Sequence, residues 1–156
     1  MKLLATVFLT LLFSSPLMAG NATNFNVALS GANERPTPND STTTGTAQLH
    51  VNQALTEITF RLDVTDGEDL LGAAGAHFHC GPADGTGPIV VWIAGSFLPG
   101  YDGAMELRGT VKDENIVNTA CGATILELVE SMLDGNVYVN VHSTEFPGGV
   151  IRGQIQ

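Results

Sequence analysis

Basic residues are scarce in this sequence of 156 residues. Six Lys and Arg stand against 16 Asp and Glu, which gives a formal net charge of −10 at pH 7. Nucleic-acid binding needs Lys and Arg against the phosphates, so this charge balance excludes nucleic acid as a partner, whereas metal cations are weakly attracted. Charged residues make up only 14% of the chain and glycine occurs 18 times, which favours a β-protein with many tight turns.

Long hydrophobic runs are also missing. The apolar run at 3–13 is shorter than the roughly 20 residues that a membrane-spanning helix needs, and no other segment is long enough to span a membrane. Lys2 precedes this run and small residues follow it, the order typical of a secretory signal peptide. We therefore expect a signal peptide at 1–22 with cleavage after Ala19 or Ala22, and a secreted or periplasmic protein without a membrane span.

Only two cysteines occur, Cys80 and Cys121. In an exported protein, a lone pair far apart in the sequence most simply forms a disulfide. Closing a loop of about 40 residues would stabilise the fold by roughly 3–4 kcal/mol. The alternative, two thiolate metal ligands, is disfavoured in an oxidising compartment. The remaining chain, residues 23–156, is long enough for one domain with a proper core.

Short segments of alternating apolar and polar residues, separated by turn residues, predict about seven or eight strands. Residues 65–75 are expected to form an acidic surface loop. Thr124 and Glu127 have the spacing of a capping box and predict one helix over the apolar residues that follow, with Gly135 at its end. We expect an all-β fold, an antiparallel Greek-key β-sandwich or barrel with one short helix. The expected strands are 24–31, 46–51, 57–64, 76–80, 89–95, 104–111, 136–142 and 149–155.

Histidine occurs four times, and two of the four are one residue apart, at His77 and His79. Side chains alternate between the faces of a strand, so both point away from the core-facing Phe78. In 136–142 the valines form the core face, which leaves His142 on the opposite face. If the two strands pair, three imidazoles converge. Neutral imidazole binds copper, zinc or iron, and three histidines with one open position are the arrangement of catalytic metal sites.

With both cysteines in a disulfide, such a site favours copper(II) or zinc, and copper is the expected cofactor. His50 is the candidate fourth ligand; the alternative is a solvated surface residue. Arg152 lies across the last hairpin turn from His142 and is the candidate to attract a small anionic ligand, unless it pairs with Glu145. No Ser-His-Asp set is present, and catalysis of any kind is left open.

Two segments, 72–95 and 133–155, closely resemble the CHRD domain, a family named after chordin. The family pattern falls on Ala76–His79, Gly81–Pro82, Gly87–Val90, Gly135–His142, Pro147–Gly149 and Ile151–Gln154. The resemblance begins near Asn24 and makes residues 23–156 a CHRD domain. It implies an extracytoplasmic β-domain and no particular activity. Growth-factor binding by chordin is not carried over, because the cysteine-rich modules used for it are missing here.

The order of a His-x-His strand, a disulfide, a late Val-x-Val-His strand and an arginine is also similar, more weakly, to Cu/Zn superoxide dismutase. That similarity implies copper ligands at His77, His79 and His142 and an anion guide at Arg152. The sequence departs from that family because it has no bridging histidine and no zinc cluster, and the second cysteine lies elsewhere. We expect a metal-binding CHRD protein, with superoxide-type redox chemistry as the finer hypothesis. The alternative is a binding or matrix module without metal, in which the histidines only stabilise strands and turns.

Overall fold

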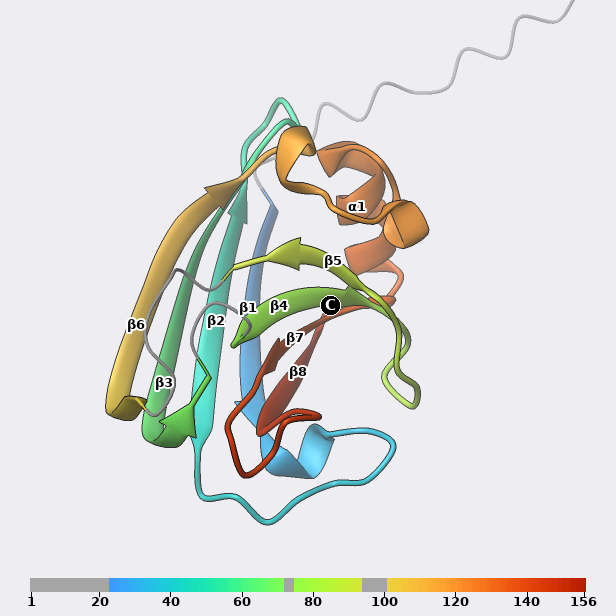
Figure 1. Cartoon of the computed structure of the whole chain (residues 1–156). Coiled ribbons are helices and arrows are strands. Elements are labelled where there is room, and N and C mark those ends of the chain that lie inside the picture. The colour runs from blue at the N-terminus through green and yellow to red at the C-terminus, as the bar shows by residue number, and fades with distance from the viewer. Residues whose placement is uncertain (1–22, 72–74, 94–100) are drawn as a thin grey trace, which may run out of the picture.

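The computed structural model describes residues 23–71, 75–93 and 101–156 (Figure 1). The expected signal peptide lies outside these residues, and no helix among them is long and apolar enough to cross a membrane. The strands are β1 (Thr23–Ser30), β2 (Thr44–Val51), β3 (Ile58–Leu70), β4 (Ala76–Cys80), β5 (Ile89–Trp92), β6 (Tyr101–Val111), β7 (Val137–Val141) and β8 (Ile151–Ile155). The helices are α1 (Ile125–Leu133) and three 3-10 turns, η1 (Gly31–Asn33), η2 (Asp113–Asn115) and η3 (Thr119–Cys121).

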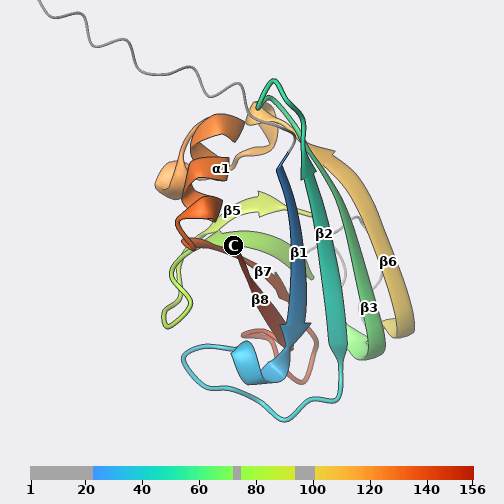
Figure 2. The ribbon, with the colours of Figure 1, turned by 180° about the vertical axis from the view of Figure 1, so that it is seen from behind.

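The eight strands form one antiparallel sheet with the order β5-β4-β7-β8-β1-β2-β3-β6. Figures 1 and 2 show β1, β2, β3 and β6 side by side, with β4, β5, β7 and β8 crossing them on the other side of the molecule. The two groups join where Ser30 of β1 pairs with Arg152 of β8. The last strand, β8, therefore returns to lie beside the first strand of the β1-β2-β3 meander.

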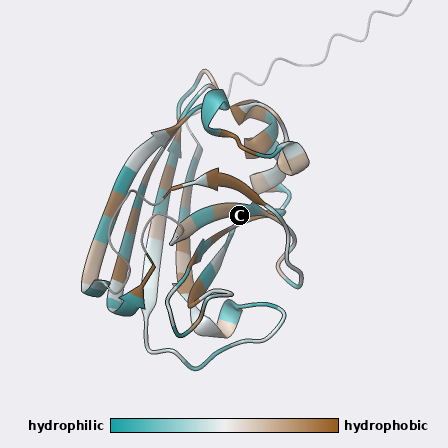
Figure 3. Ribbon diagram, in the orientation of Figure 1, coloured by the Kyte–Doolittle hydropathy of each residue, from teal (hydrophilic) through white to brown (hydrophobic). Residues whose placement is uncertain are grey.

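The sheet curls around one hydrophobic core. Phe60 of β3 and Phe78 of β4 meet edge to face with their ring centroids 6.3 Å apart, although β7, β8, β1 and β2 lie between their strands in the sheet. Hydrophilic and hydrophobic bands alternate along β3 and β6, whereas β5 is mostly hydrophobic (Figure 3). The expected antiparallel all-β fold with one α-helix is confirmed as a nearly closed barrel.

The expected loop at 65–75 is wrong for its first part, because β3 continues to Leu70. The pairing of β3 with β6 shifts register twice, on either side of Gly67. Asp66 and Asp69 take positive φ angles of 53° and 45° at these irregularities. A β-bulge inserts a residue without ending the strand, and aspartate tolerates the left-handed conformation, so a segment with the composition of a loop forms part of the sheet.

Helix α1 covers one end of the barrel, and η1 with the segment after it lies at the other end (Figures 1 and 2). The capping box is confirmed: Thr124 Oγ1 accepts from Glu127 N at 3.3 Å, and Glu127 Oε2 accepts from Thr124 N at 3.2 Å. Ahead of the helix, Cys121 forms the expected disulfide with Cys80 at the end of β4, with a Cα–Cα distance of 5.5 Å. The disulfide therefore ties the segment leading into α1 to the strand that carries His77 and His79.

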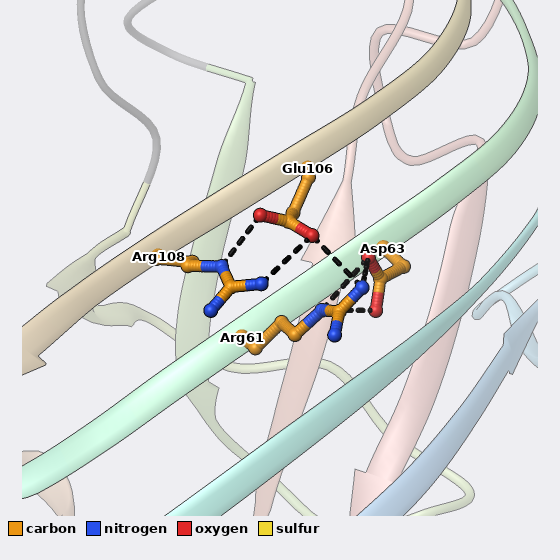
Figure 4. A network of polar contacts seen from close by, with 4 residues as sticks. All are labelled: Arg61, Asp63, Glu106 and Arg108. Carbon is orange, nitrogen blue, oxygen red and sulfur yellow. Dashed lines mark hydrogen bonds and ion pairs between the residues drawn. The ribbon is translucent and has the colours of Figure 1, made fainter.

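Two arginines face each other directly on the outer surface of β3 and β6, Arg61 and Arg108. Like charges in such a cross-strand pair repel. Glu106 forms ion pairs with both guanidinium groups, and Asp63 binds Arg61 at 2.9 Å (Figure 4). These side chains are 30% to 62% exposed, so the network contributes little to stability. The two positive and two negative charges of the network compensate one another locally.

Candidate metal centre

The two strands that carry the histidine motifs are direct neighbours in the sheet. β4 pairs antiparallel with β7, with His77 opposite Asn140 and His79 opposite Tyr138. His142 follows the last residue of β7, Val141, which pairs with Ala76. This register brings His142 to the same face as the His-x-His pair, as the alternation of side chains predicts. The strand adjacency that the sequence hypothesis requires is therefore present.

The three imidazoles form one compact cluster. One ring nitrogen from each of His77, His79 and His142 can be chosen so that the three atoms lie within 4.8 Å of one another. The ring centroid of His77 lies 5.4 Å from that of His79 and 4.9 Å from that of His142. Metal–nitrogen bonds of about 2.0–2.1 Å place ligand atoms roughly 3.5 Å apart, so the three nitrogens lie only somewhat farther apart than the ligands of one shared ion. These residues could hold one metal ion.

The cluster faces away from the core and is nevertheless buried. His77, His79 and His142 are 3%, 9% and 8% exposed. Three connecting segments cover this second face of the sheet, 31–43, 81–88 and 143–150. These segments are hydrogen-bonded to β7, β8 and His142 through Glu34, Gly85 and Pro147 respectively. The sequence pattern distinguished the core face from the opposite face, but it did not predict that the opposite face is covered.

Two of the histidines are held in a defined tautomer. His79 Nδ1 lies 2.9 Å from the carbonyl oxygen of Gly87, and His142 Nδ1 lies 3.0 Å from that of Pro147. A carbonyl only accepts hydrogen bonds, so each Nδ1 carries the proton and each Nε2 keeps a lone pair. Both Nε2 atoms are buried without a hydrogen-bond partner. Unsatisfied buried polar atoms are rare in native proteins, and histidine ligands are typically oriented by a carbonyl on the other nitrogen.

Burial keeps these imidazoles neutral. Desolvation lowers the pKa of His79 below its ordinary value of 6.5, and the charges of His142 and Arg152 lower it further, against the effect of the bond to Gly87. Desolvation likewise lowers the pKa of His142, although the bond to Pro147 opposes the shift. Metal ions bind the neutral imidazole, so both side chains are in the ligand form at pH 7.

The segment that orients His79 is itself fixed from β8. Arg152 Nη1 donates to the carbonyl of Gly85 and Nη2 to that of Pro82, both at 2.7 Å. Gly87 completes the turn, because a Cβ at this position would collide with the carbonyl oxygen of Cys80. Gly87 N also donates to the hydroxyl of Tyr138 at 3.3 Å. The Gly-Pro turns of the motif therefore place the carbonyl that holds His79.

Aromatic rings border the cluster on both sides. Tyr138 of β7 stacks on His79 with an interplanar angle of 8°, and the guanidinium carbon of Arg152 lies 3.6 Å from the centroid of the Tyr138 ring. Trp92 of β5 meets His77 edge to face, with the centroids 4.5 Å apart. Trp92 is 47% exposed, so the indole forms the solvent-facing side of the cluster.

Of the other candidate residues, His50 lies outside the cluster, whereas Arg152 lies beside it on the Tyr138 ring and is not one of the convergent ligands. His50 is exposed on β2, where its Nδ1 lies 2.8 Å from Asn24 Oδ1, and it does not belong to the group of convergent ligands. Arg152 is 2% exposed and bound to Pro82 and Gly85, while Glu145 is exposed on the turn before β8.

Glu34, which no motif in the sequence marked as a candidate, is buried on the same face. This side chain is 4% exposed, and its Oε1 accepts a hydrogen bond of 2.6 Å from Asn140 Nδ2. Desolvation raises the pKa of Glu34 to about 7, against the opposing effects of Asn140 and Arg152. Gly149, with φ 137°, leaves the room that the carboxyl occupies. No local sequence signal marks a glutamate in a Pro-rich loop as buried.

The fold and the cluster define a class: an antiparallel β-barrel domain with three buried histidines able to hold a metal ion on its second face. The family model for the CHRD domain matches residues 25–155. The chain therefore belongs to the CHRD-domain family, as its motifs indicated. Comparisons with curated proteins and with solved structures found no match.

Proposed function

We propose that this CHRD-domain protein binds one transition-metal ion, with copper favoured over zinc, through His77, His79 and His142. The observation that carries the proposal is the pair of buried Nε2 atoms on His79 and His142, each an acceptor without a hydrogen-bond partner. The opposite nitrogen of each ring is bonded to a backbone carbonyl. A cation at the centre of the cluster would satisfy both atoms at once.

Copper is favoured by the chemistry of the donors. Among divalent first-row ions, imidazole sites bind copper most strongly, and the thiols that would favour zinc are consumed in the Cys80–Cys121 disulfide. A disulfide between distant cysteines also supports action in an oxidising compartment, outside the cytoplasm. The proposed role is binding or sequestration of the metal in a secreted or periplasmic location.

Redox catalysis of the superoxide type is not part of this proposal. It would need an anion drawn to the metal, and Arg152 is the candidate guide from the sequence. The Arg152 guanidinium donates to Pro82, Gly85 and Gln154 and stacks on Tyr138, which gives it a role in holding the turn. The alternative function is a binding or matrix module without metal.

Titration of the purified protein with copper and zinc salts, followed by native mass spectrometry, tests the proposal. We expect one equivalent bound by the wild type and none retained by His79→Ala or His142→Ala. His50→Ala is the matched control, because it removes an exposed histidine outside the cluster and should keep the metal. Trp92 is the single tryptophan and lies against His77, so copper binding should quench its fluorescence.

Circular dichroism separates loss of ligand from loss of fold. A histidine variant that keeps the β-sheet spectrum and loses the metal supports the cluster as the site. If the wild-type protein retains neither copper nor zinc, the metal-binding proposal is wrong and the alternative function, a binding or matrix module without metal, is supported. Equal retention by wild type, His79→Ala and His142→Ala would place the metal elsewhere and overturn the assignment of these ligands.

A further inference from the structure

We propose that the histidine cluster selects a monovalent soft cation, copper(I), over copper(II) and zinc. This inference rests on the proposed function and adds the charge of the ion to it. Ligand type alone favours copper(II) or zinc, as the sequence suggests. The surroundings of the cluster in the folded protein reverse that order, for the following reasons.

The ligand set carries no negative charge. The convergent group consists of His77, His79 and His142, without a carboxylate among the described residues. Both cysteines are joined in the disulfide, so no thiolate is available. Three neutral imidazoles leave the full charge of the bound ion uncompensated by its ligands.

The cluster is buried, which makes that uncompensated charge costly. The histidines are 3% to 9% exposed. The cost of transferring an ion from water to a medium of low polarity grows with the square of its charge, so a divalent ion costs about four times as much as a monovalent ion of equal size. Divalent sites in proteins usually offset this cost with carboxylates, thiolates or a bound hydroxide.

The buried charged groups around the cluster add to the penalty. Arg152 and Glu34 are the buried Arg and Glu side chains among the described residues. The guanidinium of Arg152 lies on Tyr138, the ring that stacks on His79, so a fixed positive charge stands one ring away from the ligands. Glu34, whose pKa is raised to about 7, supplies only part of a negative charge at neutral pH and is turned toward Asn140.

The aromatic rings beside the cluster disfavour the hydroxide ligand with which a divalent ion offsets part of its charge. A catalytic zinc on three histidines completes its shell with water, which it ionises to hydroxide near pH 7. Here the Tyr138 ring packs on His79 and the Trp92 ring packs on His77, so aromatic faces and edges occupy these two sides of the cluster. Copper(I) is satisfied by two or three ligands and needs no such anion.

Competition titrations test the selectivity. Under anaerobic conditions, copper(I) is supplied as its complex with a chromophoric chelator of known affinity. Silver(I) serves as a monovalent probe without redox chemistry. Copper(II) and zinc are titrated separately. We expect the dissociation constant for copper(I) to be at least about tenfold below that for either divalent ion, a difference of about 1.4 kcal/mol. His50→Ala should reproduce the wild-type values.

A matched pair of variants at Trp92 isolates the effect of charge. Trp92→Glu and Trp92→Gln both remove the half-exposed indole beside His77, and they differ only in one negative charge. If uncompensated charge sets the selectivity, Trp92→Glu should bind zinc at least about tenfold more tightly than Trp92→Gln, with a smaller gain for silver(I). Equal zinc affinities would overturn the electrostatic explanation.

The outcomes distinguish this inference from the function on which it rests. Wild type that binds zinc or copper(II) more tightly than copper(I) at the three histidines would overturn the selectivity and leave metal binding intact. Wild type that binds none of the four ions would overturn the proposed function as well. Binding of copper(I) with unchanged affinity by the double variant His79→Ala/His142→Ala, which leaves one histidine of the cluster, would show that the ion sits elsewhere.

Discussion

Replacing Glu34 by glutamine should remove a pH dependence from the stability of this protein. The glutamine side chain keeps an oxygen that can accept the hydrogen bond from Asn140 Nδ2, and it has nearly the same shape as glutamate. It differs in having no proton to lose. The substitution therefore isolates the cost of ionising the carboxyl group of a residue that is 4% exposed and belongs to the covering segment 31–43.

The magnitude follows from the shift in the pKa of Glu34. Burial raises this pKa from its ordinary value of 4.5 to about 7, so the folded protein holds the proton more tightly than the unfolded chain. The stabilising contribution is fully present below pH 4.5 and is lost as pH rises through about 7. At 1.36 kcal/mol per pH unit, the wild type loses about 3 kcal/mol of unfolding free energy over this interval from this group.

Urea unfolding of the metal-free protein, with the disulfide intact, measures the effect at a series of pH values. The free energy of unfolding of Glu34→Gln, relative to wild type, should rise by about 3 kcal/mol from below pH 4.5 to above pH 7. Glu114→Gln, at an exposed position in η2, is the control and should show no comparable rise. A difference between Glu34→Gln and wild type that stays constant with pH would refute the reasoning.

Three further outcomes are expected. Arg152→Met should leave the Pro82 and Gly85 carbonyls without their hydrogen-bond donors. We expect it to lower the unfolding free energy in urea by about 2–4 kcal/mol and to weaken metal binding. The control Arg108→Met, at an exposed position, should change neither the unfolding free energy by a comparable amount nor metal binding. Because burial lowers the pKa of His79 and His142, silver(I) affinity should be retained as pH falls to 6.5 and decline only below it; a titration midpoint above 6.5 would contradict this. Replacing both cysteines by serine opens a loop of 41 residues and should cost about 4 kcal/mol in chemical denaturation, and an unchanged midpoint would count against the chain-entropy account.

Local patterns in the sequence were sufficient for the number of strands, the helix and the faces of the strands, although they missed the continuation of β3 to Leu70. Alternation of apolar and polar residues identified the strands, and the capping box at Thr124 identified α1 and its first residue. The count of two cysteines predicted the disulfide. Alternation also placed His77 and His79 on the face opposite Phe78, because side-chain direction in a strand depends only on position along the chain.

Tertiary structure decided whether those faces form a site. The pairing of β4 with β7 joins segments separated by β5, β6 and α1, and such pairing depends on how distant elements share one core. The groups that orient His79 and His142 are the backbone carbonyls of Gly87 and Pro147, which every residue possesses and which therefore leave no mark in the sequence.

Burial of the second face was likewise beyond the sequence. A polar residue on the face opposite the core is ordinarily solvated. Here the covering segments pack over that face, so that Arg152 holds the turn at Pro82 and Gly85 by hydrogen bonds and Glu34 is a buried acid. The sequence by itself determined which side chains share a face. The tertiary structure alone decided which faces meet and which lose their water, because these depend on contacts between residues far apart in the chain, and those contacts set the chemistry of the site.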